Sequence, residues 1–130
     1  MTSRGDVISR YEAASAKDDF DAMASLRHRD WQMLLPQSGE LLRGHANYVG
    51  MRRNRPEGAP RVEPLRHGGG GDVWWSEAIV HYADGTRWLA VTVYEFEGDL
   101  IRHERVYFGQ PFAGPAWRAK WVEKGAPAIA

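Results

Sequence analysis

The chain has 130 residues, enough for one domain with its own core, so we expect a single domain spanning residues 1–130. Its 17 basic and 17 acidic residues balance, and no segment concentrates one sign of charge, which argues against binding to nucleic acid or an anionic membrane. We therefore expect a small and largely uncharged ligand. The absence of cysteine excludes disulfides, thiolate nucleophiles and thiolate metal ligands.

No apolar run approaches the roughly 18 residues that a membrane-spanning helix requires, and MTSRGDVISRYEAA lacks the apolar core of a signal peptide. We therefore expect a cytoplasmic protein. The five histidines show no HxH or HExxH spacing, so neither a dedicated metal site nor another cofactor is expected.

The first half of the chain is predicted to be mainly helical. Apolar residues recur at helical spacing between Val7 and Ala14, after Ser3 and Asp6, which have the pattern of a capping box. These residues predict an amphipathic first helix.

A short second helix, a strand and a third helix follow. Asp18 or Asp19 can cap a helix around Phe20, and DWQMLL has the composition of a strand that ends at Pro36. We interpret PQSGE as a turn or loop. A third helix is predicted from residue 44 to about residue 53, before the proline- and glycine-containing loop NRPEGAP.

The second half is predicted to form strands. The segments RVEPLRH, DVWWSEAIVHYA, TRWLAVTVYEFE and LIRHERVYF are rich in β-branched and aromatic residues and are joined by HGGGGD, DG and GD. The last three should form consecutive antiparallel strands. HGGGGD precedes a strand and lacks the lysine of a phosphate-binding loop, so we interpret it as a flexible turn.

The Asp-Gly pair at residues 84–85 sets the predicted pairing of two strands. A two-residue turn centred there pairs Ile79 with Ala90 and Glu77 with Thr92. One face then has the mixed aromatic and polar composition of a ligand site: Trp75, Glu77, Ile79, His81, Trp88, Ala90, Thr92 and Tyr94. The opposite face has the composition of packing surface: Trp74, Ser76, Ala78, Val80, Leu89, Val91 and Val93.

Glu77 is the leading catalytic candidate because an ionised carboxylate is costly to bury in a strand of this composition. Among aromatic side chains its pKa should rise by desolvation, which suits a group that exchanges protons near neutral pH. The alternatives are an ion pair with an arginine such as Arg66 or Arg102, or a position at a hydrated pocket mouth.

The segments VISRYEAASAKDDFDAM, PQSGELLRG and IRHERVYFGQPFAGPAWRAKWVE resemble small bacterial SnoaL-like proteins of the nuclear transport factor 2 (NTF2) superfamily. The resemblance extends over about residues 5 to 123, and it includes the ketosteroid-isomerase-like branch. It implies an α+β fold, in which three N-terminal helices pack on a strongly curved, mainly antiparallel sheet to form a cone. A short C-terminal helix containing Trp117 and Trp121 is expected to pack back onto the domain.

The resemblance carries over only parts of the known catalytic sets. Ketosteroid isomerases use an aspartate base and an oxyanion hole of a tyrosine and a protonated aspartic acid; these positions fall on Leu35, Tyr11 and Thr92 respectively. In limonene-epoxide-hydrolase-like proteins two carboxylates and an arginine activate water, and these positions fall on Glu77, Val106 and Trp75. Neither set is intact.

The resemblance also orients the last strand. It implies that Glu104, Val106 and Phe108 face the concave side with Glu77 and Thr92. The alternate residues of that strand, His103, Arg105 and Tyr107, would then face outward, towards a homodimer interface on the sheet.

Four residues are therefore catalytic candidates. Glu104 would pair with Glu77 so that one carboxyl is an acid and the other a base, or it is a solvated glutamate. Tyr11 would donate to a carbonyl or enolate oxygen, or it is a core tyrosine; Thr92 would donate beside it, or it is an ordinary strand residue. His45 is a further possible base or a solvated histidine.

Aromatic and apolar side chains would form the wall of the substrate site: Trp31, Tyr48, Trp75, Trp88, Tyr94, Val106 and Phe108. The leading hypothesis is a cofactor-free enzyme that performs isomerisation, aldol-type cyclisation or elimination on a hydrophobic carbonyl or enol compound. A second hypothesis is a non-catalytic ligand-binding or dimerisation module. A third is epoxide-hydrolase-like addition of water by Glu77 and Glu104.

Overall fold

In the computed structural model, which describes residues 3–125, helix α1 (Arg4–Ala16) begins at the predicted capping box. The Ser3 side chain accepts a hydrogen bond from the Asp6 backbone, and the Asp6 side chain accepts one from the Ser3 backbone. Helix α2 (Phe20–Leu26) begins at Asp19, whose carboxylate accepts a hydrogen bond from the Ala22 N–H. The predicted starts of both helices are therefore confirmed.

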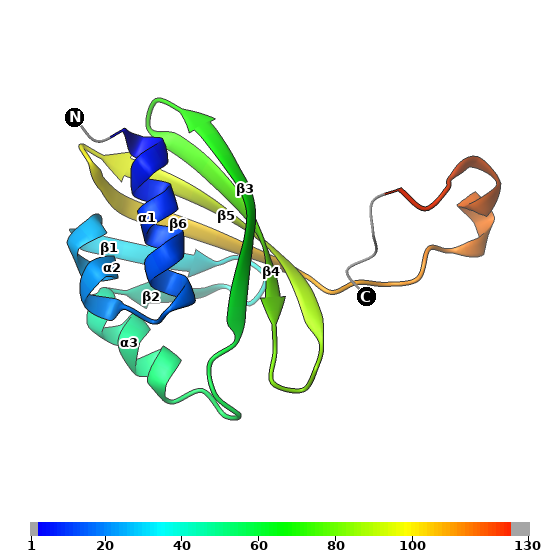
Figure 1. Cartoon of the computed structure of the whole chain (residues 1–130), viewed down its shortest axis with the longest axis horizontal. Helices are drawn as coiled ribbons and strands as arrows, with labels where there is room; N and C mark the ends of the chain where they lie inside the picture. The colour runs from blue at the N-terminus through cyan, green and yellow to red at the C-terminus, as the bar shows by residue number, and fades with distance from the viewer. Residues whose placement is uncertain (1–2, 126–130) are drawn as a thin grey trace.

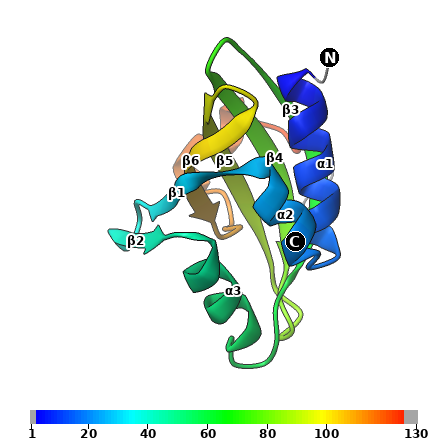
Figure 2. The same cartoon turned by 90° about the vertical axis from the view of Figure 1, so that its left-hand side faces the viewer.

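Six strands form one mixed sheet with the order β2-β1-β6-β5-β4-β3. The strands are β1 (Arg27–Leu35), β2 (Glu40–Arg43), β3 (Arg61–Gly70), β4 (Val73–His81), β5 (Arg87–Glu97) and β6 (Leu100–Gly109), and α3 (His45–Arg53) lies between β2 and β3 in the chain. β1 and β6 are parallel, and the other pairs are antiparallel. Figures 1 and 2 show that the sheet curves strongly from one edge strand, β2, to the other, β3, and that α1 crosses it.

Two predicted boundaries need correction at the start of this sheet. β1 begins at Arg27, three residues before the predicted segment, because its pairing with β6 extends back to Ile101. Part of the segment predicted as a loop forms β2, whose Glu40 pairs with Leu35 of β1. A short edge strand of four residues is too brief to show a clear alternation in the sequence.

The glycine run is also different from its prediction as a flexible turn. Gly68 and Gly69 belong to β3, and the turn is formed by the residues after it. A Cβ atom on Gly69 would lie 2.6 Å from the Trp74 Cα, and one on Gly68 would lie 2.8 Å from the Trp75 ring. The glycines are therefore needed because β4 and its two indoles approach the β3 backbone closely.

Residues 82–86 connect β4 to β5, and the pairing of Tyr82 with Thr86 closes a loop of three residues, 83–85, instead of the predicted two. Tyr82 N donates to Thr86 O at 3.0 Å, and Gly85 N donates to Tyr82 O at 3.0 Å. Gly85 has φ +86, the left-handed conformation that closes a common three-residue hairpin loop.

This extra loop residue moves β4 by one position relative to β5, so the predicted pairing is wrong. Glu77 pairs with Val91, and Ser76 pairs with Thr92. Since alternate strand residues point to opposite faces, a shift of one residue exchanges the two faces of β4. The concave face of β4 therefore carries Ser76, Ala78 and Val80, and the outer face carries Trp75, Glu77 and Ile79.

The core lies between α1, α2, α3 and the concave face of the sheet. Its largest fully buried side chains are Trp31, Ile8, Met23 and Ile101. None of the helices in residues 3–125 is both long and apolar enough to cross a membrane.

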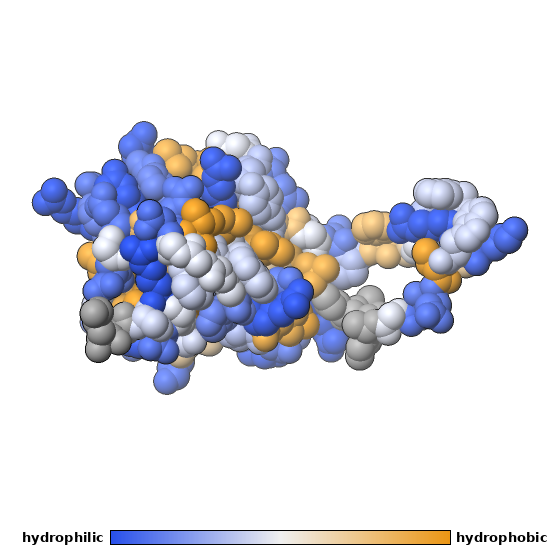
Figure 3. All heavy atoms as spheres, turned by 90° about the horizontal axis from the view of Figure 1, so that it is seen from above, coloured by the Kyte–Doolittle hydropathy of each residue, from blue (hydrophilic) through white to orange (hydrophobic). Residues whose placement is uncertain are grey.

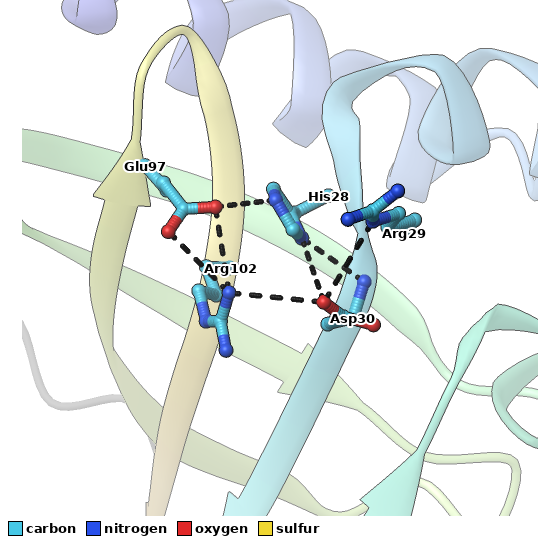
Figure 4. Close-up of polar contacts among 5 residues, drawn as sticks. All are labelled: His28, Arg29, Asp30, Glu97 and Arg102. Carbon is cyan, nitrogen blue, oxygen red and sulfur yellow. Dashed lines mark hydrogen bonds and ion pairs between the residues drawn. The ribbon is translucent and has the colours of Figure 1, made fainter.

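A polar network joins the beginning of β1 to the turn between β5 and β6 (Figure 4). The His28 Nε2 contacts Glu97, while the His28 Nδ1 accepts a hydrogen bond of 3.0 Å from the Asp30 N–H. Arg102 lies 3.4 Å from Glu97 and 3.9 Å from Asp30. The network spans the irregular pairing of β1 with β6 over residues 27–32 and so helps to fix the start of β1.

The C-terminal segment, residues 110–125, projects away from the body as an arm (Figures 1 and 3). It contains a 3-10 helix, Ala116–Trp121, in which no residue is buried. Phe112, Trp117 and Trp121 are 80%, 74% and 73% exposed. The prediction that this helix packs back onto its own domain is therefore wrong.

Candidate functional site

A cavity of about 570 Å³ lies on the concave side of the sheet, with walls from α1, α2, α3 and the five strands other than β2. This volume is in the range of small-molecule sites, and the wall is predominantly apolar. Seven residues predicted for the site line the cavity: Tyr11, Tyr48, Thr92, Tyr94, Glu104, Val106 and Phe108. The orientation of β6 implied by the resemblance is thus confirmed.

A chain of short hydrogen bonds forms the buried end of the cavity. The Tyr11 hydroxyl donates to Glu104 Oε2 at 2.5 Å, and Trp31 Nε1 donates to the same oxygen at 2.7 Å. Arg27 Nε in turn donates to the Tyr11 oxygen at 2.6 Å. All four residues are buried, so the three elements α1, β1 and β6 hold one connected polar cluster inside an apolar core.

Arg27 completes this cluster, although sequence reasoning did not identify it. Its Nη1 donates to His45 Nδ1 at 2.7 Å, and its guanidinium lies 3.7 Å from the ring centre of Trp31 and 4.1 Å from that of Tyr48. Its Nη2 is buried without a hydrogen-bond partner and lies 4.0 Å from Glu104 Oε2. A buried donor without an acceptor is costly, and the cavity wall is where a ligand oxygen would relieve that cost.

The signal for Arg27 was present but ambiguous. Arg27, Trp31 and Met33 are odd-numbered residues of one strand, so they share one face of it, and all three are buried. The segment LRHRD is highly charged, however, and a charged segment before a strand is normally solvated. With the strand predicted to start later, nothing placed Arg27 on its inner face.

Burial controls the protonation of Glu104 and its neighbours. Desolvation raises the pKa of Glu104, and Arg27, Tyr11 and Trp31 oppose this without cancelling it. Burial also raises the pKa of Tyr11, with the adjacent Glu104 carboxylate adding to the effect, so Tyr11 stays a hydrogen-bond donor. Desolvation, followed by Arg27, lowers the pKa of His45, which favours the neutral ring that accepts from Arg27.

A second carboxyl group, Glu12, also lines the cavity and was not predicted. It follows Tyr11 on α1, and its Oε1 lies 3.0 Å from His67 Nδ1 of β3. Burial raises its pKa, while the nearby His67 opposes the rise. Two carboxyls with raised pKa values therefore contact the same cavity.

Glu77 lies outside this cavity, because the actual pairing of β4 turns it to the outer face. Its two oxygens accept hydrogen bonds from Arg66 Nε and Nη2, both at 3.0 Å. These hydrogen bonds hold the pKa of Glu77 below its ordinary value. Of the alternatives left open by the sequence, the ion pair with Arg66 is the one observed, and Arg102 instead contacts Glu97.

Three predicted wall tryptophans do not line the cavity. Trp75 is on the outer face, where the Arg66 guanidinium lies 5.5 Å from the centre of the Trp75 ring. Trp88 packs edge-to-face against Tyr82, and Trp31 is buried behind the cavity wall, where it holds Glu104. The aromatic wall is formed mainly by tyrosines instead, namely Tyr11, Tyr48, Tyr82 and Tyr94, together with Phe108.

No three histidine, aspartate or glutamate side chains within residues 3–125 are grouped so that they could hold a metal ion.

The comparisons with known sequences gave no match to a protein-family model or to a curated protein. Among solved structures, an NTF2-like protein of unknown function from Burkholderia xenovorans LB400 is 33% identical. The match covers 95% of each chain with a TM-score of 0.83.

Other solved structures share the fold at lower identity. A candidate ketosteroid isomerase from Kribbella flavida is 18% identical, with 97% of this chain and 92% of that chain covered and a TM-score of 0.85. A candidate SnoaL-like polyketide cyclase from Shewanella putrefaciens is 11% identical, with 84% and 91% covered and a TM-score of 0.69. At these identities the likeness establishes the fold alone.

Proposed function

Because the chain belongs to the NTF2-like superfamily, as its 33% identity over 95% of a solved NTF2-like chain shows, we propose a family-typical use of its cavity. The protein is a cofactor-free enzyme that moves a proton next to a carbonyl or enol group of a hydrophobic small molecule. The superfamily resemblance predicted from the sequence is confirmed. The activity is argued from the cavity, since one fold supports many functions.

The observation that carries the proposal is a buried carboxyl with a raised pKa on the wall of an apolar cavity. Glu104 combines burial, a hydrogen bond from Tyr11 and contact with a space of small-molecule size. A carboxyl with a raised pKa is a stronger base than a solvated one, which suits it to proton abstraction near neutral pH. Glu104 thereby takes the role that the sequence assigned first to Glu77.

The proposed step is an enolisation. The C–H bond next to the ligand carbonyl breaks, its proton moves to the Glu104 carboxylate, and the electron pair moves to the carbonyl oxygen. Arg27, through its unpaired Nη2, and Thr92 on the cavity wall bind the developing oxyanion, while Tyr11 continues to donate its only hydroxyl proton to Glu104. Returning the proton to another carbon gives isomerisation, and attack or elimination from the enolate gives cyclisation or dehydration.

The test is hydrogen exchange of a bicyclic ketone. 2-Tetralone in D₂O is followed by NMR with the wild-type protein and with Glu104→Gln. We expect catalysed deuterium incorporation next to the carbonyl, and a loss of about 100-fold or more in the variant, the lower range for a positioned base.

The matched control is Glu77→Gln, which removes a carboxylate from the outer face and should leave the exchange rate unchanged. Equal exchange by the wild type and Glu104→Gln would reject the proposed role. So would an equal loss in Glu77→Gln, or exchange no faster than in buffer alone.

A non-catalytic ligand-binding module is the second candidate. This candidate is favoured by the hydrogen bonds that Tyr11 and Trp31 donate to Glu104 Oε2. They satisfy this oxygen without a ligand, as expected for a carboxyl with a structural role. Saturable binding of 2-tetralone without Glu104-dependent exchange would support this candidate. The third hypothesis fails in its original form, because Glu77 and Glu104 lie on opposite faces of the sheet and cannot activate one water together.

We also propose a homodimer through the outer face of the sheet. Leu89, Val91 and Tyr107 are exposed on neighbouring strands of this face. Exposed apolar side chains grouped on one surface are typical of an interface between protein chains.

A further inference from the structure

Besides Glu12 on α1, the wall of the cavity carries ionisable side chains at two separate places. Arg27 and Glu104 form the buried end, and Arg52 and Arg55 belong to the end of α3 and the loop after it. Arg52 follows Tyr48 by one helical turn, about 6 Å along the axis, and Arg55 lies farther on. Since the Arg27 guanidinium packs on the Tyr48 ring, Arg52 lies about one helical turn beyond the buried end.

Arg52 is held at the cavity wall with part of its guanidinium unsatisfied. Its side chain is 10% exposed, and its Nη2 donates to Asp18 Oδ1 at 2.7 Å and to Pro60 O at 3.4 Å. Its Nε is buried and has no hydrogen-bond partner. An unpaired buried guanidinium N–H is costly and would be relieved by an acceptor from a ligand.

Arg55 adds a second positive charge at the more exposed part of the wall. Its guanidinium lies 4.8 Å from the ring centre of Tyr82, and both residues line the cavity. It also contributes to lowering the pKa of Asp84, after the hydrogen bonds from Thr86. Asp18 contacts Arg52 and Asp84 lies near Arg55, and neither acid lines the cavity, whereas Glu12 of α1 does.

Apart from Asn54, the cavity wall around these arginines is mainly apolar. It includes Met51, Pro56, Pro60, Val62 and Val80. A ligand that fills the cavity therefore meets a buried polar end, an apolar middle and a cationic outer part.

We propose that the ligand is a hydrophobic carboxylate, whose anionic group is bound by Arg52 and Arg55 while its carbonyl or enol group reaches Glu104. The placement of the reacting group rests on the proposed function; the anion site does not. The net charge of zero predicted an uncharged ligand, but an overall balance does not report where the charges lie. Arginine is well suited to a carboxylate because its planar group makes two parallel hydrogen bonds.

The test compares two naphthalenes of similar size, 2-naphthoate and 2-acetylnaphthalene, by titration of the tryptophan fluorescence. They differ in that one carries a carboxylate and the other a methyl ketone. We expect the wild type to bind the carboxylate about tenfold more tightly or better, as charge-assisted hydrogen bonds imply.

Arg55→Gln and Arg52→Lys should reduce this preference at least about threefold each, with little change for the ketone. Arg55 is exposed, so its variant is expected to fold even if a change at Arg52 is disruptive. The matched control is Arg53→Gln, which removes a charge from the same helix at a position outside the cavity and should keep the preference.

The proposal is overturned if naphthoate shows no saturable binding or binds no tighter than the ketone. It is also overturned if Arg55→Gln leaves the preference intact, or if Arg53→Gln removes as much of it. Glu104→Gln should retain the preference. If exchange of 2-tetralone is not catalysed but the preference for naphthoate persists, only the enzymatic proposal is rejected. If exchange is catalysed but naphthoate is not preferred, only the anion site is rejected.

Discussion

Glu104 is a carboxyl on which burial and hydrogen bonding act in opposite directions. Its ionised form is disfavoured by the apolar surroundings and favoured by Tyr11, Trp31 and the nearby Arg27. Because burial dominates, the folded state holds a proton on Glu104 more tightly than the unfolded chain does. The same group that is proposed to transfer a proton therefore also affects stability.

We predict that the stability of the wild type falls relative to Glu104→Gln as the pH rises. The pKa of Glu104 is higher in the folded protein than the ordinary value of 4.5. The stabilising contribution of protonated Glu104 is therefore complete below pH 4.5 and is lost as the pH rises through the pKa of the folded state. Glutamine keeps its contribution at every pH. Urea unfolding of both proteins between about pH 4 and pH 8 measures the difference, about 1.4 kcal/mol for each unit of pKa shift.

Glu77→Gln is the control of opposite sign. The pKa of Glu77 is lowered by Arg66, so its contribution is present above the ordinary value and is lost as the pH falls through the folded value. The wild type should therefore gain stability relative to this variant as the pH rises. If the free energy of unfolding had the same pH dependence in the wild type and in Glu104→Gln, the pKa of Glu104 would not be raised by folding.

At the scale of single residues, the sequence predicted Tyr11, Glu104 and Thr92 at the cavity, but not Arg27. The first three were found by resemblance and strand alternation. Arg27 was missed because its burial depends on partners from other elements, Tyr11 and His45, which no local pattern reveals. Long-range pairs of this kind are a property of the fold rather than of the segment.

At the scale of elements, the approach of β4 to β3 depends on glycine. Gly69 has φ +144, and a Cβ atom there would lie 2.6 Å from the Trp74 Cα and 2.7 Å from the Val73 carbonyl oxygen. These contacts are with backbone atoms, which cannot move away as a flexible side-chain end can. The position of Trp74 is therefore linked to this glycine.

We predict that Gly69→Ala destabilises the protein by about 1–3 kcal/mol, the cost of a residue held in a sparsely populated backbone conformation. Gly70→Ala is the matched control, since a Cβ atom on Gly70 would have no other atom within 4 Å. Urea denaturation compares the two variants. Equal stability of the two would mean that β3 and β4 can separate locally at no cost.

The hairpin shows why the faces of β4 could not be predicted from the sequence. Asp-Gly is compatible with a two-residue turn and with a three-residue loop that ends in a left-handed glycine. The structure has the second arrangement, with Gly85 at φ +86. One residue of loop length separates the two, yet it decides whether Glu77 or Ser76 faces the cavity.

At the scale of the whole molecule, apolar surface remains exposed on the outer face of the sheet and on the C-terminal arm. Val91 and Tyr107 lie on adjacent strands, and Trp117 and Trp121 lie in the arm. The general α+β fold was predictable from the helical and strand patterns and the resemblance. The direction of the arm was not, because a short segment with two tryptophans has the same composition whether it packs inside or outside its own domain.

We predict that Val91→Lys converts a dimer into a monomer, because two like charges would meet near the centre of the proposed interface. Leu41→Lys is the control, since Leu41 is 44% exposed and Val91 39%, but Leu41 lies on the edge strand β2. Sedimentation velocity at several concentrations measures the mass. A monomeric wild type, or an equal effect of both changes, would contradict an interface on the outer face.

The most direct measurement of the central claim is a carbon-13 NMR titration of the glutamate carboxyls, with Glu104 assigned by its loss in Glu104→Gln. We predict that Glu104 titrates above the ordinary value of 4.5, and that saturating 2-tetralone changes its titration while that of Glu77 is unaffected. A Glu104 resonance that titrates at or below 4.5, or that does not respond to the ligand, would contradict a poised carboxyl at the cavity wall.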